Sequence, residues 1–261
     1  MKRVTSRRNA IVERYRAVAR GDEAGLLLDG PHLVSDAVAA KVRIVSAIVA
    51  SASEAQPDVA ASVAALTRRH VEILSASPAV MAAVSPVRSS SAIVALAEPR
   101  ALPVDAPYAA RLPLVVIACD VQDPGNLGAI VRVAEAGGAS GVVAAGACAN
   151  PFGWKALRGS MGSALRLPVV AQPRIDQAIA QARTRGCRVI ATAPRDGQSL
   201  FRADLKGPLA VLVGSEGAGL PADVTDTADE RVSIPMAPPV ESLNTAVTAA
   251  LVVYEATRQR Q

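Results

Sequence analysis

Short blocks of hydrophobic and polar positions alternate along the first hundred residues, and they predict a small domain of mixed helices and strands. A basic helix is expected at residues 9–20, and the apolar run Leu26-Leu27-Leu28 before Asp29-Gly30-Pro31 predicts a strand, a turn and a second helix. Further strands are expected near residues 42–50, 71–74 and 93–97, with helices at 56–68 and 77–83. Residues 1–97 therefore make the first predicted domain.

A proline-rich stretch at residues 98–112 separates this domain from the rest of the chain. Three prolines there predict an interdomain linker, because proline restrains the backbone and removes a hydrogen-bond donor. Beyond it, in a second predicted domain at 113–261, strands are expected at 112–120, 141–145, 169–171, 188–193, 208–214 and 231–235, and helices at 126–137, 175–185, 221–227 and 242–259. Such alternation is typical of a mostly parallel sheet that is covered on both faces.

Composition narrows the class of protein. Apolar residues make up 51% of the 261 residues and charged residues 20%, which excludes disorder and a disulfide scaffold. Aromatic residues are only 2%, so an RNA-binding module built on aromatic stacking is disfavoured. No apolar run approaches the roughly 20 residues of a membrane helix, and the basic N-terminus lacks the apolar core of a signal peptide. We expect a cytoplasmic protein without a membrane partner.

The cysteines and histidines do not suggest a metal site. Cys119, Cys148 and Cys187 are widely spaced, and His32 and His70 are isolated from them. A zinc site needs closer pairs of ligands, so we expect the cysteines to be small buried hydrophobes.

Positive charge is concentrated at the N-terminus. The formal net charge is +5, and residues 1–20 hold seven Lys or Arg side chains against the single acid Glu13. Such a cluster fits a phosphate-contacting surface, and it fits a solvated basic terminus equally well.

Three segments that follow predicted strands could carry chemistry. In the first, Asp123-Pro124-Gly125-Asn126 turns the chain and caps a helix. Arg132 lies less than two helical turns beyond Asn126, so the two side chains could face one cleft. An ion pair between Arg132 and Glu135, three residues apart, is the alternative.

The other two segments are rich in glycine and proline. Residues 212–220 contain three glycines that allow close approach to a ligand, but they lack the Lys-Ser/Thr of a phosphate-binding loop and the fingerprint of a dinucleotide site. Residues 232–247 open the last predicted helix, where Ser242 could serve as an N-cap.

Together these segments resemble one known family. DPGNLGAIVRVAEAGG, VLVGSEGAGL and SIPMAPPVESLNTAV, in this order, are similar to the motifs of the SpoU/TrmH family of the SPOUT superfamily, the RNA ribose 2'-O-methyltransferases. The resemblance covers residues 113–258. The N-terminal sequences SRRNAIVERYR and LLLDGPHLVSDAV are similar to the small RNA-binding domain that many members carry.

The resemblance implies a SPOUT-type α/β trefoil-knot catalytic domain preceded by a small α/β RNA-binding domain. It implies S-adenosylmethionine as cofactor, RNA as substrate and a homodimer that completes each active site. Catalytic roles fall to Asn126, Arg132, Glu216 and Asn244. Cofactor contacts fall to Thr192, Ala193, Leu212, Gly214, Ile234, Met236 and Leu243. RNA contacts fall to Arg7, Arg8, Arg14, Glu135 and Ser242.

The chain departs from the family pattern at two places. The family commonly has a serine where Ala246 stands, and a glycine in the stretch where Pro238-Pro239 stands. We expect an active enzyme acting on ribosomal (23S) RNA, with a role in antibiotic resistance open. The alternatives are a transfer-RNA 2'-O-methyltransferase and a catalytically weakened RNA-binding protein that keeps the fold.

Overall fold

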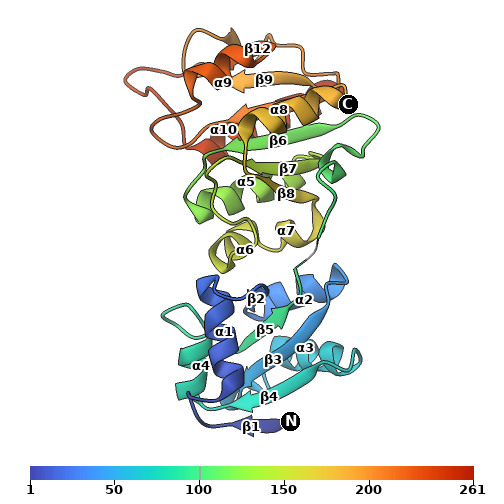
Figure 1. The fold of residues 1–261 in the computed structure, drawn as a ribbon, viewed down its shortest axis with the longest axis vertical. Helices are drawn as coiled ribbons and strands as arrows, with labels where there is room; N and C mark the ends of the chain where they lie inside the picture. Colours follow the sequence, from blue (N-terminus) through green and yellow to red (C-terminus); the bar gives the residue numbers. More distant parts are fainter. Residues whose placement is uncertain (100) are drawn as a thin grey trace. The chain divides into compact units, whose positions relative to one another are not determined.

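The computed structural model describes residues 1–99 and 101–261, which form two compact units (Figure 1). The first unit comprises Met1–Ala101 together with Phe152–Leu165, and the second comprises Leu102–Pro151 together with Arg166–Gln261. The sequence pattern placed residues 152–165 in the second domain, so the grouping by contacts differs there from the predicted one. Arg100, within the predicted linker, lies outside the described residues.

The first unit contains a mixed five-stranded sheet. Its strands, in spatial order, are β1 (Lys2–Val4), β4 (Glu72–Ala76), β3 (Ile44–Ala50), β5 (Ile93–Ala97) and β2 (Leu26–Asp29). β5 runs antiparallel to both of its neighbours, whereas β1, β4 and β3 are parallel. Only the three-residue edge strand β1 was not predicted, because its length leaves no periodic pattern to detect.

Helices cover both faces of this sheet (Figure 1). α1 (Ala10–Arg20) and α4 (Pro78–Val84) contribute to one apolar cluster with the strands, while α2 (Pro31–Ala39) and α3 (Pro57–Thr67) pack on each other and on the sheet. A short 3-10 helix, η1 (Ser51–Ser53), follows β3. The predicted basic helix is confirmed as α1, which begins where Asn9 caps the Ile11 amide and ends at Gly21 with φ +84°.

The segment at 152–165 is held by its own apolar and polar contacts. It forms α6 (Trp154–Ser160) and most of α7 (Ser163–Arg166), and α6 contacts β2. Trp154 packs against the apolar cluster of α1 and α4. The Arg158 guanidinium lies 3.8 Å from the buried carboxylate of Asp29, which also accepts a hydrogen bond from Ser85. These contacts place α6 in the first unit.

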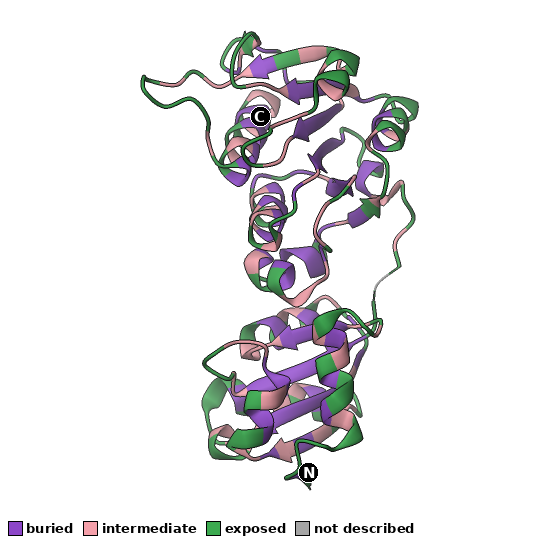
Figure 2. Cartoon of the chain, turned by 60° about the vertical axis from the view of Figure 1, so that its left-hand side comes forward, coloured by how far each residue is buried: buried purple, intermediate pink, exposed green. Residues whose placement is uncertain are grey.

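The second unit contains a seven-stranded sheet, and all of its paired strands are parallel. The strands, in spatial order, are β10 (Gln198–Ser199), β12 (Glu230–Ser233), β9 (Arg188–Thr192), β11 (Leu209–Val213), β6 (Leu114–Cys119), β7 (Gly141–Ala145) and β8 (Val169–Gln172). The predicted parallel sheet is confirmed, apart from the two-residue β10, which was missed. Figure 2 shows that the strands of this sheet are largely buried.

Both faces of the parallel sheet are covered, as predicted. α8 (Ile175–Thr184) packs on one face with alternate residues of the central strands. α5 (Pro124–Ala136) and α10 (Thr245–Arg260) pack on each other and on the sheet at β6, β7 and β11. The 3-10 helix η2 (Ala106–Tyr108) and the short α9 (Ala222–Thr227) complete the unit.

The last helix begins later than the sequence predicted. α10 starts at Thr245 rather than at Ser242, because the side chain of Asn244 accepts hydrogen bonds from the amides of Ala246 and Val247. Asn244, and not Ser242, is therefore the N-cap.

The strand order brings the chemistry-bearing loops together. β12, β9, β11 and β6 are consecutive neighbours and parallel, so the loops at their carboxyl ends emerge at one edge of the sheet. No helix in the described residues is long and apolar enough to cross a membrane.

Candidate active site

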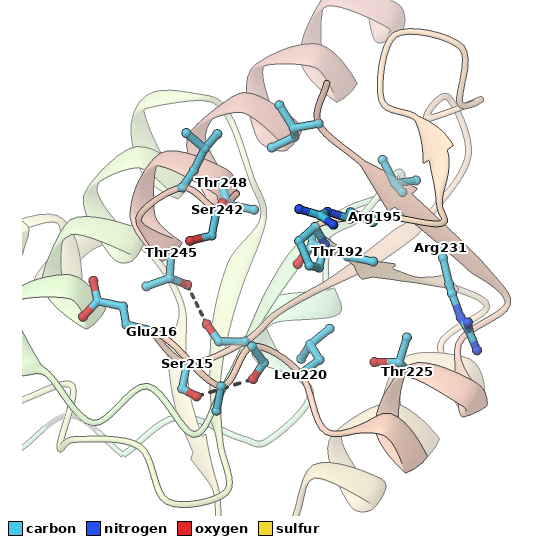
Figure 3. A pocket seen from close by; sticks show the side chains of 18 of the residues that line it. Thr192, Arg195, Ser215, Glu216, Leu220, Thr225, Arg231, Ser242, Thr245 and Thr248 are labelled. Carbon is cyan, nitrogen blue, oxygen red and sulfur yellow. Dashed lines mark hydrogen bonds between the residues drawn. The ribbon is translucent and has the colours of Figure 1, made fainter. Parts of the chain in front are cut away.

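A cavity of about 640 Å³ opens at the carboxyl ends of β9, β11 and β12 (Figure 3). Five segments form it: the loop after β9, the glycine loop after β11, the short helix α9, the end of β12 with the segment after it, and the first turns of α10. Its walls combine backbone and hydroxyl groups with the side chains of Leu220, Ile234, Met236 and Leu243. The size and the mixed lining fit a small-molecule site.

The glycine loop doubles back on itself at Gly214. A Cβ atom at this position would lie 2.2 Å from the carbonyl carbon of Gly219 and 2.4 Å from the amide nitrogen of Leu220. Gly217 and Gly219 have positive φ angles, which side chains disfavour. The sequence Gly-Ser-Glu-Gly-Ala-Gly thus makes a compact loop that carries Glu216 near its tip.

Most of the predicted cofactor residues line this cavity. They are Thr192, Ala193, Gly214, Ile234, Met236 and Leu243. Leu212 does not line it, because its side chain is fully buried in β11. Its carbonyl instead accepts a 2.9 Å hydrogen bond from the hydroxyl of Thr192, which ties β11 to the end of β9.

Asn244 contacts two of the other predicted catalytic residues, Asn126 and Glu216. Its side-chain amide donates to Asn126 Oδ1 at 3.1 Å and to Glu216 Oε1 at 2.6 Å. Its carbonyl oxygen accepts from the Ala246 and Val247 amides at 2.9 and 3.3 Å. An asparagine side chain offers two donor hydrogens and two acceptor lone pairs, so Asn244 has all four engaged. In this arrangement it positions Asn126 and Glu216.

Asn126 and Glu216 reach this meeting point from different elements. Asn126 stands in the first turn of α5. Its backbone N–H donates to Oδ1 of the N-cap Asp123 at 2.8 Å, which is the predicted cap. Glu216 lines the cavity and lies across it from Arg231 (Figure 3). Both keep polar atoms that the bond to Asn244 leaves available.

Arg132 lies apart from this network. It is exposed on α5 and, within the described part of the chain, has no hydrogen-bond or ion-pair partner. The alternative prediction of an Arg132–Glu135 ion pair is wrong. Glu135 accepts two hydrogen bonds from Arg166, at 2.8 and 2.9 Å, a partner 31 residues away that no local pattern could indicate.

Thr245 supplies a hydroxyl next to the position where the family's serine is missing. Its Oγ1 donates to the Gly214 carbonyl at 2.8 Å and joins α10 to the glycine loop (Figure 3). Ala246 is buried directly beside it. The departure at position 246 therefore leaves a hydroxyl bond between helix and loop in place.

Several cavity residues were not predicted. Thr248 lines the cavity one helical turn after Asn244, and helical spacing could have indicated it. Thr225 and Arg231 line the side across from Glu216 (Figure 3), and Asp226, which also lines the cavity, pairs with Arg231. No sequence signal distinguishes these three from ordinary surface residues. Ser242, which was predicted as an RNA contact, also lines the cavity.

The basic N-terminal cluster divides into two groups. Acidic side chains neutralise the first group: Arg14 pairs with Glu23 at 2.8 Å, Arg16 with Glu13 at 3.3 Å, and Arg20 with Asp22 at 2.7 Å. The second group has no acidic partner among the described residues and consists of Lys2, Arg3, Arg7 and Arg8. The Arg7 guanidinium donates to the carbonyl of Ala79 at 3.0 Å.

The three cysteines are free thiols in the described chain. Cys119 and Cys187 are buried and Cys148 is half-buried, and burial raises the pKa of each thiol. The Cys148 sulfur lies 3.2 Å from the carbonyl oxygens of both Ala118 and Ala145, which share its single donor hydrogen. In the residues that the structure describes, no group of three or more His, Cys, Asp or Glu side chains could hold a metal ion.

Comparison with known proteins places the chain. Residues 113–254 match the model of the SpoU rRNA Methylase family. A Synechocystis protein named as an uncharacterised tRNA/rRNA methyltransferase is 35% identical over 98% of this chain and 94% of its own length. A 23S rRNA (guanosine-2'-O-)-methyltransferase of Ralstonia nicotianae is 39% identical over 57% of this chain and 59% of its own length.

Solved structures match nearly the whole chain. The SpoU methyltransferase AviRb from Streptomyces viridochromogenes, in complex with AdoMet, superimposes with a TM-score of 0.87 at 28% identity and covers 97% of this chain and 98% of its own. An AdoMet-bound rRNA methyltransferase from Sinorhizobium meliloti gives 0.85 at 30% identity and covers 98% of this chain and 97% of its own.

These matches define the protein as an RNA methyltransferase. Because the family model covers more than half of the chain and one relative aligns over nearly all of it, the chain belongs to the SpoU rRNA methylase family. The predicted family, the α/β fold, the enzyme class of RNA ribose 2'-O-methyltransferase and the cofactor S-adenosylmethionine are confirmed. The trefoil knot and the individual site residues stay predictions.

Proposed function

We propose that this enzyme methylates a ribose 2'-hydroxyl of ribosomal RNA and works as a homodimer. The observation that carries the proposal is the bond pattern of Asn244, which holds Asn126 and Glu216 together beside the cavity that the predicted cofactor residues line. Relatives named for rRNA in Ralstonia and Sinorhizobium support a ribosomal target.

The cavity fits the cofactor in both shape and chemistry. Gly214 leaves room where any side chain would collide with the loop backbone, and the apolar side chains of Ile234, Met236 and Leu243 suit the adenine and the methylene groups of the methionine part. When bound, S-adenosylmethionine supplies a methyl group activated by its sulfonium. The hydroxyls of Thr192 and Thr248 and the loop backbone would give it polar contacts.

We assign the chain's own residues to aligning the ribose and managing charge. Asn126 and Glu216, fixed by Asn244, would orient the hydroxyl toward the cavity, since alignment of reactants lowers the barrier strongly. A guanidinium is a poor general base because it does not give up its proton in proteins, so Arg132 would hold the neighbouring phosphate and stabilise the developing alkoxide. Ser242 and Glu135 would make further RNA contacts.

In the first unit, we assign the RNA contact to the N-terminal basic side chains that have no acidic partner among the described residues. Lys2, Arg3, Arg7 and Arg8 would neutralise phosphates. Arg14 is already paired with Glu23 and would have to give up that partner, so it is a weaker candidate than the sequence suggested.

An apolar stripe on α10 supports the homodimer. Val247, Leu251 and Tyr254 follow one another at helical spacing and are 46%, 39% and 53% exposed. The same helix lines the cavity through Thr245 and Thr248. A second copy packed on this stripe would therefore lie beside the active site, where it could supply its own Arg132.

The proposal is tested by transfer of labelled methyl from S-adenosylmethionine to bacterial RNA, separated into ribosomal and transfer pools. We expect label in the ribosomal pool that is resistant to alkaline hydrolysis, the mark of a 2'-O-methyl group. Arg132→Ala should abolish the label while cofactor affinity stays near that of the wild type. Arg174→Ala, which removes an exposed charge at the N-cap position of α8, is the matched control.

Each other outcome decides against part of the proposal. Label in the transfer pool alone would replace ribosomal RNA with transfer RNA as substrate, an alternative that the Synechocystis relative's name also covers. Absence of label, together with absence of cofactor binding, would favour the weakened RNA-binding protein. Normal transfer by Arg132→Ala would remove Arg132 from the mechanism.

A further inference from the structure

Residues 237–243 form an irregular segment between β12 and α10, which we call the strap. It has neither helix nor strand, and all of its residues except the half-buried Leu243 are exposed. A turn with the Val240 amide donating to the Ala237 carbonyl shapes its middle. The two prolines, Pro238 and Pro239, restrict its backbone further.

The strap runs between two hollows. Ser242 and Leu243 line the 640 Å³ cavity, whereas Pro238, Pro239, Val240 and Glu241 line a second hollow of about 510 Å³. Four residues line both hollows: Pro194, Arg195, Ile234 and Met236. The two spaces therefore adjoin, and the strap together with Arg195 stands at their common border.

One ion pair fastens the strap to the loop after β9. The Arg195 guanidinium donates to Glu241 Oε1 at 3.0 Å. Within the described chain it is the one hydrogen bond or ion pair between residues 237–243 and any other segment. The two side chains are 70% and 79% exposed, so water and salt reach the pair freely.

We propose that the Arg195–Glu241 pair positions the strap and thereby sets the rate at which S-adenosylmethionine leaves its cavity. While the pair is formed, Ser242 and Leu243 stay against the cavity and the two hollows remain separate. When it breaks, the strap can swing on its two ends and join the hollows into one path to solvent. This inference rests on the proposed role of the 640 Å³ cavity as the cofactor site.

The test measures dissociation of radiolabelled S-adenosylmethionine by rapid filtration after dilution into excess unlabelled cofactor. Glu241→Gln is the informative variant, because Glu241 lines only the second hollow and does not touch the cofactor cavity. We expect its dissociation rate to exceed that of the wild type about two- to fivefold, which is the range that an exposed ion pair can give. Arg195→Gln should give a similar increase, and the double variant no further one.

Two further measurements separate positioning from simple loss of structure. Exchanging the charges, Arg195→Glu with Glu241→Arg, should restore the slow rate. Raising the salt concentration from 50 to 500 mM should accelerate dissociation from the wild type, because salt screens the pair, and should leave Glu241→Gln unchanged. Asp176→Asn, which breaks the 64%-exposed Arg174–Asp176 pair outside the cavity, is the control and should keep the wild-type rate.

The possible failures differ from one another. A wild-type protein that binds no S-adenosylmethionine would overturn the cofactor site itself. Normal binding with an unchanged rate in Glu241→Gln would overturn the strap inference alone. An effect of Arg195→Gln without one of Glu241→Gln would show that Arg195 contacts the cofactor directly, and this too overturns the inference.

Discussion

Asn244 joins the N-terminus of α10 to both Asn126 and Glu216, and its side chain has no hydrogen-bonding capacity left for RNA or cofactor. The asparagine was predicted as a catalytic residue. The contacts support a positioning role instead, in which one side chain fixes three segments: the start of α5, the glycine loop and the start of α10. Glu216 accepts its bond at 2.6 Å, so the geometry leaves little room for a longer side chain.

Substitutions at Asn244 separate the helix cap from the positioning. Asn244→Ala should lose both functions. Loss of the cap alone should lower the free energy of unfolding by about 1 kcal/mol, and loss of the positioning should greatly reduce methyl transfer. Asn244→Asp keeps an equally good cap but places a carboxylate against Glu216, so the two like charges repel.

In acid, one of the two carboxyl groups, that of the new aspartate or that of Glu216, takes up a proton and can donate a hydrogen bond to the other. Under these conditions the aspartate variant should therefore unfold at a higher temperature than the alanine variant. Its methyl transfer should recover partly as the pH falls from 8 to 5.5, measured in single turnovers beside the wild type. An activity in Asn244→Ala equal to that of the wild type would remove Asn244 from the site.

At the scale of helices and strands, periodicity predicted most of the second unit because each element is long enough to repeat its pattern. It missed the two-residue β10 in this unit and the three-residue β1 in the first unit. It also missed α7 and α6, and the place of α6 in the first unit depends on the packing of Trp154 and on Arg158 beside Asp29. Contacts of this kind join residues far apart in sequence and leave no local signal.

In the candidate site, too, the sequence indicates which residues belong together but not how they contact one another. The motif resemblance placed Asn126, Glu216 and Asn244 in one site, and the structure brings these side chains together. Their hydrogen-bond pattern, the Arg166 partner of Glu135 and the Arg195–Glu241 pair depend on tertiary geometry. Sequence spacing alone does not contain that geometry.

Gly214 gives a prediction for the glycine loop. Gly214→Ala would place a methyl group 2.2 Å from the backbone of Gly219, and backbone yields less readily than a side chain end. We expect a stability loss of about 1–3 kcal/mol and weaker binding of S-adenosylmethionine, measured by thermal unfolding and calorimetric titration. Gly207→Ala is the matched control, because no atom lies within 4 Å of its added Cβ. Equal behaviour of the two variants would contradict the packed loop.

For the molecule as a whole, the distribution of charge matters more than the formal net charge of +5. The arginines of α1 lie in ion pairs, whereas the charges before α1 have no acidic partner among the described residues. Only unpaired cations release counterions from RNA without first losing a partner. The N-terminal edge of the first unit is therefore the surface that should respond to salt.

Salt dependence tests this division of charges. Arg7→Gln with Arg8→Gln should reduce the slope of log affinity for protein-free ribosomal RNA against log salt by about 1–2. Arg14→Gln with Glu23→Gln removes a pair without changing the net charge, and should leave the slope as it is. A larger effect from the second pair of substitutions would place the RNA contact on α1 instead.

The burial of the thiols has a practical consequence for following the enzyme at work. Thiolates are the species that maleimide and iodoacetamide reagents attack, and burial raises the pKa of Cys119, Cys148 and Cys187. The three native thiols should therefore react slowly with such reagents and interfere little with labelling at an introduced cysteine. A single cysteine introduced at the exposed Val240 would carry a fluorophore on the strap, so its opening could be watched in real time in one molecule.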